Sequence, residues 1–223
     1  MRNLKTNLEC EILGQTIAFS DTYTRIGSIV SIKNFEAILE GIHCGKIFEA
    51  ITTLYPLTHC DLLTISKKVS ELCPNVAFKT VAWVISDLCK NVVHNVNVEH
   101  HCYMLVQMCV QDEFEKILAE ISTTSNAILK VEINEIFASL KLGYDIFDII
   151  TKSGRHLIEL GFETEAKKII ALDGNITLKV RSIKAANQIQ TLARNVEKLV
   201  CLNAEKKEEL RNHIYGIIKI IGY

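Results

Sequence analysis

Hydrophobic residues recur at helical spacing along most of the chain. The first such run begins at Asn34 and predicts a helix that ends near Pro56. Its apolar positions, spaced i, i+3, i+4 and i+7, are Phe35, Ile38, Leu39 and Ile42. Capping residues, glycines and prolines divide the rest of the chain into further predicted helices. They are residues 58–72, 75–88, 97–121 and 125–142, one helix before Gly161 and one after it that ends at Gly174, and residues 175–200 and 203–222.

The clearest amphipathic pattern in the first half follows Asn97, a plausible helix cap. Its apolar stripe consists of Tyr103, Val106, Val110, Phe114, Ile117, Leu118 and Ile121. The acidic residues of this stretch fall mostly on the other side, where they form a solvated face. We therefore expect a long helix that packs against the core through its apolar stripe.

The N-terminal segment has a different pattern. Leu8, Cys10 and Ile12 alternate with neighbours such as Glu9, and Gly14 with Gln15 could form a turn, so the pattern predicts a short hairpin over 8–19. The predicted fold class is mainly α, a multi-helix array or bundle of about nine helices with a small N-terminal β-hairpin.

Length and composition are those of an ordinary globular protein. The chain has 223 residues, 48% of them hydrophobic and 23% charged, with a formal net charge of −1. We expect a single compact helical domain over 1–223, with a soft boundary near 143–150. Residues 1–150 carry 12 Lys and Arg against 18 Asp and Glu, and residues 151–223 carry 13 against 8. The two parts are thus acidic and basic, which suggests an interaction surface.

The eight cysteines are expected to be reduced. The N-terminus has no apolar secretory segment, and no stretch is apolar for long enough to span a membrane, so we expect a cytoplasmic, reducing location and no membrane contact. The composition, rich in Lys, Ile and Asn and poor in Pro, suggests an AT-rich genome, viral or from an intracellular microbe.

A repeat is one interpretation of the cysteine spacing. Cys44, Cys73 and Cys102 are 29 residues apart, as are Cys60 and Cys89. The other positions of the three copies agree poorly. Helix pairs of similar length are therefore the simpler interpretation.

Three His-Cys dipeptides could suggest metal or nucleophile chemistry. They are His43-Cys44, His59-Cys60 and His101-Cys102. Adjacent residues on a helix point about 100° apart, and no Cys-x2-Cys pair is present, so the spacing does not favour zinc. No glycine-framed nucleophile or phosphate-binding loop occurs either. We expect no metal site, no catalytic residues and no cofactor.

The predicted helix 175–200 carries a basic face. The residues that could contact nucleic acid are Lys179, Arg181, Lys184, Arg194 and Lys198. Phosphate binding is one interpretation of this face. The other is that the charges pair with the acidic part of the chain, within one molecule or between copies.

The end of the chain is rich in isoleucine. The residues expected at an interface are Ile214, Tyr215, Ile217, Ile218 and Ile221. An apolar terminus of this kind packs into a core or against a partner. We therefore expect a non-catalytic protein that binds another protein or itself, with RNA binding as the alternative function.

Overall fold

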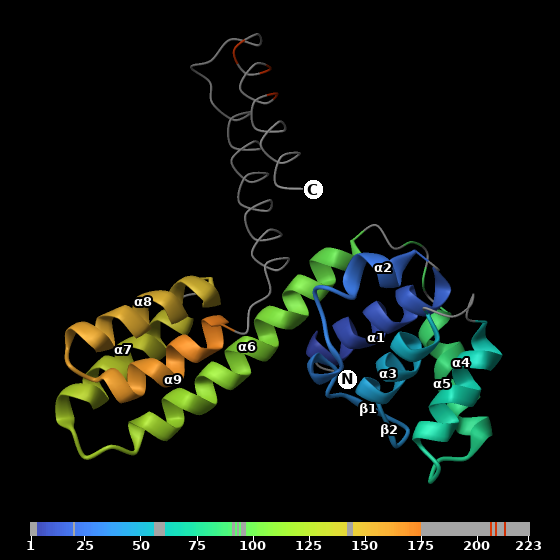
Figure 1. Cartoon of the computed structure of the whole chain (residues 1–223), viewed down its shortest axis with the longest axis horizontal. Coiled ribbons are helices and arrows are strands. Elements are labelled where there is room, and N and C mark those ends of the chain that lie inside the picture. Colours follow the sequence, from blue (N-terminus) through green and yellow to red (C-terminus); the bar gives the residue numbers. More distant parts are fainter. Residues whose placement is uncertain are drawn as a thin grey trace. The chain divides into compact units, whose positions relative to one another are not determined.

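The computed structural model describes residues 4–19, 21–55, 61–90, 92, 94, 97–141, 145–174, 206, 208 and 212. Nine α-helices and one two-stranded antiparallel hairpin are found among these residues, which confirms the predicted fold class (Figure 1). The elements are α1 (Leu4–Ala18), α2 (Thr22–Ile26), the 3-10 helix η1 (Ile32–Asn34), β1 (Ile38–Leu39), β2 (Ile42–His43), α3 (Cys44–Leu54), α4 (Leu62–Leu72), α5 (Phe78–Cys89), α6 (Val98–Ser122), α7 (Ala127–Lys141), α8 (Ile146–Glu159) and α9 (Glu163–Gly174).

The predicted position of the hairpin, over 8–19, is wrong, because residues 8–18 are part of helix α1. Other elements surround α1, which packs against α2, α3, α5 and α6. Its buried residues are Leu8, Glu9, Cys10, Ile12, Leu13, Gly14, Gln15, Thr16 and Ile17. A helix covered on most sides has no single apolar stripe, so its helical period is not visible in the sequence.

The hairpin lies further along the chain, where the sequence pattern predicts the start of a helix. In β1 and β2, Ile38 pairs with His43 and Leu39 pairs with Ile42. The two residues between them, Glu40 and Gly41, have φ angles of 49° and 82°. Positive φ at both positions is typical of the tight turn that matches strand twist. The predicted helix from Asn34 is therefore limited to α3, which begins at Cys44.

Helices α4 and α5 pack against each other, and α4 also packs against α3. Asp61 caps α4, because its side chain accepts a hydrogen bond of 2.7 Å from the Thr64 backbone N–H. The cysteines spaced by 29 residues occupy different places: Cys44 begins α3, Cys73 follows the last residue of α4, and Cys102 lies inside α6. Their spacing therefore does not mark a structural repeat.

Helix α6 is the long helix that the sequence predicts, and Asn97 stands at its N-cap position, although its side chain makes no capping hydrogen bond. It packs against α1 and α2 and also against α7, α8 and α9 (Figure 1). Most of its predicted stripe is buried, including Tyr103, Phe114 and Leu118. The α6 helix thus contributes to the core along much of its length.

Helices α8 and α9 form a close pair. Asp145 caps α8, its carboxylate accepting hydrogen bonds from the backbone N–H groups of Phe147 and Asp148 at 3.0 and 3.3 Å. A Cβ atom added to Gly154 of α8 would lie 2.6 Å from Cγ1 of Ile170 in α9. A glycine is therefore needed for this close approach.

Contacts along the chain define two compact units, residues 1–175 and 176–223. The expected soft boundary at 143–150 falls inside the first unit. The predicted helices 175–200 and 203–222 lie outside the described residues, apart from three single positions. In the part of the chain that is described, no helix has the length and apolar character needed to cross a membrane.

Candidate functional site

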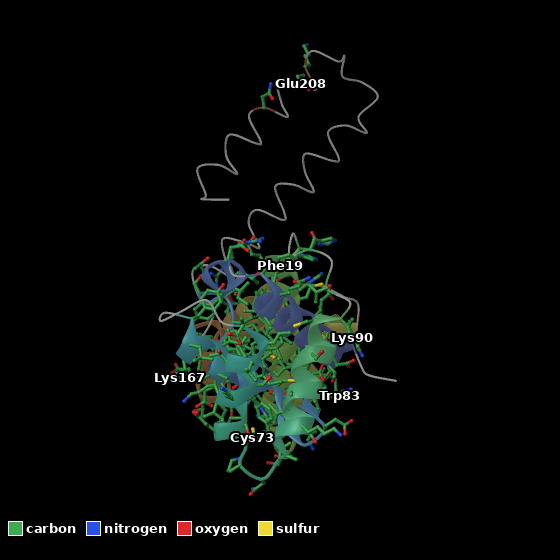
Figure 2. The ribbon with its side chains drawn as sticks, turned by 90° about the vertical axis from the view of Figure 1, so that its right-hand side faces the viewer. Phe19, Cys73, Trp83, Lys90, Lys167 and Glu208 are labelled. Atoms are coloured by element: carbon green, nitrogen blue, oxygen red, sulfur yellow. The ribbon has the colours of Figure 1, made fainter. Side chains whose placement is uncertain are left out.

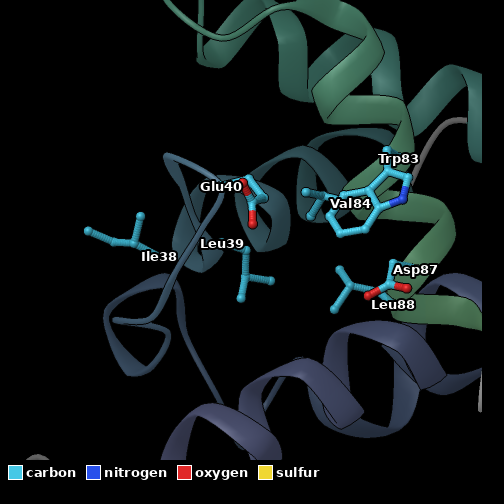
Figure 3. Close-up of a pocket in the computed structure, with 7 residues that line it drawn as sticks. All are labelled: Ile38, Leu39, Glu40, Trp83, Val84, Asp87 and Leu88. Carbon is cyan, nitrogen blue, oxygen red and sulfur yellow. The ribbon is translucent and has the colours of Figure 1, made fainter. Parts of the chain in front are cut away.

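The candidate site is a pocket between the hairpin and helix α5, with a volume of about 160 Å³. The hairpin provides one wall and α5 provides the other (Figure 3). The hairpin residues are Ile38, Leu39 and Glu40, and the α5 residues are Trp83, Val84, Asp87 and Leu88.

Three apolar side chains lie at the base of the pocket. Leu39, Val84 and Leu88 line it with side chains that are 7%, 3% and 9% exposed. These side chains are nearly covered by the core, so most of the open surface of the pocket comes from the other lining residues.

The outer part combines an aromatic ring with two acids. Trp83 is 52% exposed, although tryptophan is usually largely buried. Figure 2 shows it on the outer flank of α5, towards Lys90 at the end of the helix. Glu40 is exposed, and Asp87 is half-buried and lies 3.4 Å from the Lys90 ammonium. The rim can therefore contact a group that is both apolar and cationic.

Helix α1 holds the hairpin wall in place. Glu9 of α1 is only 1% exposed, and its carboxylate accepts a hydrogen bond of 2.8 Å from the Ala37 backbone N–H. Burial raises the pKa of the Glu9 carboxyl, while the backbone N–H groups of Ala37 and Glu36 oppose that shift. The link fixes the chain just before β1.

The same helix holds the α5 wall. A Cβ atom added to Gly14 would lie 2.2 Å from the Leu88 backbone oxygen, so α1 and α5 cross at very short distance. Leu88 itself lines the pocket. Helix α1 thus sets the separation of the two walls, although it contributes no lining residue.

The His-Cys dipeptides have structural roles where they are described. His43 accepts a hydrogen bond from the Gly45 backbone N–H at 3.1 Å and so caps α3, while Cys44 is fully buried. His101 and Cys102 lie on α6, and His101 Nδ1 is 3.5 Å from the Glu11 carboxylate. His59 and Cys60 lie outside the described residues. Within the described ranges, no three His, Cys, Asp or Glu side chains are grouped so as to hold a metal ion.

The described cysteines are all free thiols, namely Cys10, Cys44, Cys73, Cys89, Cys102 and Cys109. Burial raises the pKa of Cys89 to about 11 and also raises the pKa of Cys73, Cys102 and Cys109. Hydrogen bonding with Cys10, together with burial, raises the pKa of Cys44. Because the thiolate is the nucleophile, these five thiols are poor nucleophiles at neutral pH.

The residues that the sequence analysis selected for binding all lie outside the described residues. They are Lys179, Arg181, Lys184, Arg194 and Lys198 of the basic segment, and Ile214, Tyr215, Ile217, Ile218 and Ile221 near the C-terminus. Their predicted roles stay predictions.

The sequence analysis missed the pocket. One signal was present, because Trp83 falls off the α5 stripe that contains Val81, Ile85 and Leu88. A large aromatic residue on the polar side of a helix is a reason to expect a binding surface. The hairpin wall had no comparable signal.

Comparisons with models of known protein families, with curated proteins and with solved structures found no match.

Proposed function

We propose that this chain is a non-catalytic protein that acts through protein contacts and associates with itself. The observation that carries the proposal is the opposite charge of its two compact units. Residues 1–175 hold 16 Lys and Arg against 22 Asp and Glu, a net charge of −6. Residues 176–223 hold 9 against 4, a net charge of +5.

Opposite charge favours association between copies. The acidic unit of one molecule attracts the basic unit of another, which raises the association rate and selects the relative orientation of the two molecules. The isoleucine-rich residues 214–221 supply the apolar contact that charge alone lacks, because apolar burial provides most of the stabilisation at a lasting interface.

Two features of the first unit support a non-catalytic role. The five thiols with a raised pKa are unsuited to nucleophilic attack. The pocket beside Trp83, at about 160 Å³, is also smaller than the roughly 300–1,000 Å³ of sites for small molecules and cofactors.

Size exclusion with light scattering tests the proposal. Nuclease-treated protein should form an oligomer at low salt and lose mass as salt is raised, because salt screens attraction between exposed charges. A monomer at every salt and protein concentration would contradict self-association.

Nucleic-acid binding is the second candidate function. The basic segment favours it, because five cations lie within residues 179–198 and Glu197 is the only acid there. We expect the variant with Lys179, Lys184, Arg194 and Lys198 replaced by Glu to lose retention on RNA, if the wild type binds at low salt. Absence of wild-type binding at low salt would remove this candidate.

A further inference from the structure

The pocket beside Trp83 has room for one long side chain. Its volume of about 160 Å³ lies below the roughly 300–1,000 Å³ of small-molecule sites and suits a single side chain. Leu39, Val84 and Leu88 form only a small apolar base, and the accessible surface is supplied mainly by the rim. A partner side chain with a short apolar part and a polar end would therefore fit between this base and the rim.

The rim specifies the chemistry at the end of that side chain. The Trp83 ring offers a π face, and Glu40 and Asp87 offer two carboxylates (Figure 3). Arginine combines an aliphatic stem with a planar cation that stacks on an indole and forms paired hydrogen bonds with a carboxylate. Lysine matches the charge but lacks the planar group.

The ion pair between Asp87 and Lys90 does not block this site. Their side chains are 35% and 63% exposed, at a separation of 3.4 Å. Such an exposed pair within one helix contributes little to stability. An incoming guanidinium can therefore replace the Lys90 contact at little cost.

Glu40 is an unusual residue for its place in the turn. Its φ of 49° lies in the left-handed region, where Gly, Asn and Asp are preferred in hairpins. A side chain held in such a conformation is a reason to look for a function. The function that fits here is the placement of a carboxylate at the rim of the pocket.

We infer that this pocket binds an arginine side chain from residues 176–223 of a second copy of the chain, an inference that rests on the proposed self-association. That segment has a net charge of +5 and contains Arg181, Arg194 and Arg211. It complements the two acids at the rim and the net charge of −6 on residues 1–175. The pocket thus supplies a specific contact in addition to the charge attraction and the apolar contact of residues 214–221.

Trp83 reports directly on occupancy, because it is the only tryptophan in the chain. We would dilute the full-length protein and record its tryptophan emission and its mass by light scattering. The emission should change as the oligomer dissociates, with the same midpoint in both measurements, because stacking of a guanidinium alters the surroundings of the indole.

Glu40→Asn is the main test variant. Asparagine suits the left-handed turn, so the variant should fold at least as well as the wild type while it loses the rim charge. Its dissociation midpoint should rise about fivefold, the upper range for loss of one ion pair at an exposed rim. Glu71→Gln, which removes an exposed acid on α4 outside the pocket, is the control and should change the midpoint less than about twofold.

A second variant tests the identity of the cation. Replacing Arg181, Arg194 and Arg211 together by Lys keeps the charge of the segment but removes the planar group. This variant should still associate at low salt, with Trp83 emission that no longer follows association. Unchanged behaviour of the emission would overturn the assignment to arginine.

The outcomes separate the two proposals. A wild type that stays monomeric would refute self-association itself. A wild type that associates while Trp83 emission stays constant, or with the Glu40→Asn midpoint unchanged, would overturn the pocket inference and leave self-association standing. The Arg-to-Lys variant could also differ from the wild type in Trp83 emission at every dilution, whether the protein is monomeric or oligomeric. That result would place the arginine in the same copy and overturn the assignment to a second copy.

Discussion

The two sides of helix α5 differ in what they contribute to the protein. On the inner side, Val81 and Ile85 are completely buried, and Leu88 meets the backbone crossing with α1. On the outer side, Trp83 is half-exposed and leaves much of its ring in water. The inner residues account for the position of the helix, whereas core packing does not explain a tryptophan on the outer side.

Replacing Ile85 by Ala should produce the largest effect. The side chain is completely buried, so its loss removes apolar contacts and leaves a cavity, with a decrease of about 3 kcal/mol in the free energy of unfolding. Urea denaturation measures this change. Trp83→Ala on the same helix is the control and should cost less than about 1 kcal/mol. Equal losses for the two variants would show that the sides of α5 do not differ as we describe.

Replacing Gly14 by Ala should have the next largest effect. The new Cβ atom would lie 2.2 Å from a backbone oxygen, which cannot move without shifting α5. We expect a loss of about 2 kcal/mol from overpacking, even though alanine favours helix by about 1 kcal/mol. Thermal or urea denaturation provides the measurement.

Gly154→Ala, at the contact of α8 with α9, is the control for Gly14→Ala, at the contact of α1 with α5. Its Cβ atom would meet the Ile170 side chain at 2.6 Å, and a side chain can rotate away, so the loss should be about 1 kcal/mol or less. A larger loss at Gly154 than at Gly14 would contradict a crossing limited by backbone contact.

Replacing Glu40 by Asn should raise stability slightly. The residue has a φ of 49°, which asparagine adopts more readily than glutamate, so we expect a gain of about 0.5 kcal/mol. The denaturation midpoint of Glu40→Val provides the contrast, because a β-branched residue is strained at positive φ and should destabilise. A loss of stability in Glu40→Asn would mean that the glutamate supports the fold.

The smallest effect concerns pH. Burial lowers the pKa of His101 below its ordinary value of 6.5; nearby His100 and His94 act in the same direction, and Glu11 opposes them. The unfolded chain therefore binds a proton first as pH falls. The stability that the neutral His101 side chain contributes is fully present above pH 6.5. It is lost as the pH falls from 6.5 through the pKa of His101 in the folded protein.

Urea midpoints at pH 7.5 and 5.5 measure this loss. His101→Gln should reduce the difference between the two midpoints. An undiminished difference in His101→Gln would assign the pH dependence to other groups.

The helices that bury a single face could be predicted from the sequence. Helix α1, which is buried on most sides, and the short hairpin could not. The α6 stripe was predictable, because a helix that packs through one face shows its period locally. Helix α1 is buried on most sides, so its alternating residues resembled a strand. The hairpin has two-residue strands, too short for any period, and Ile38 and Leu39 happen to fit helical spacing.

The candidate pocket depends on contacts that are distant in the sequence. Trp83 could have been identified from its place off the α5 stripe. Its position opposite Glu40 could not, because 43 residues separate them and the hairpin is held by Glu9 and Ala37, which no local pattern connects. The pocket can be recognised only when the position of helix α1, which sets the distance between the hairpin and α5, is known.

Helix α1 therefore bears on how this pocket could be recognised in other chains. A relative could keep Trp83, Glu40 and Asp87 and still lack the pocket, if it had a larger residue in place of Gly14 or no acid in place of Glu9. Conversely, lining residues could vary during evolution while the gap between the walls is preserved. A useful signature would thus combine a small residue and a buried acid five positions apart near the N-terminus with an outward-facing tryptophan about seventy residues later.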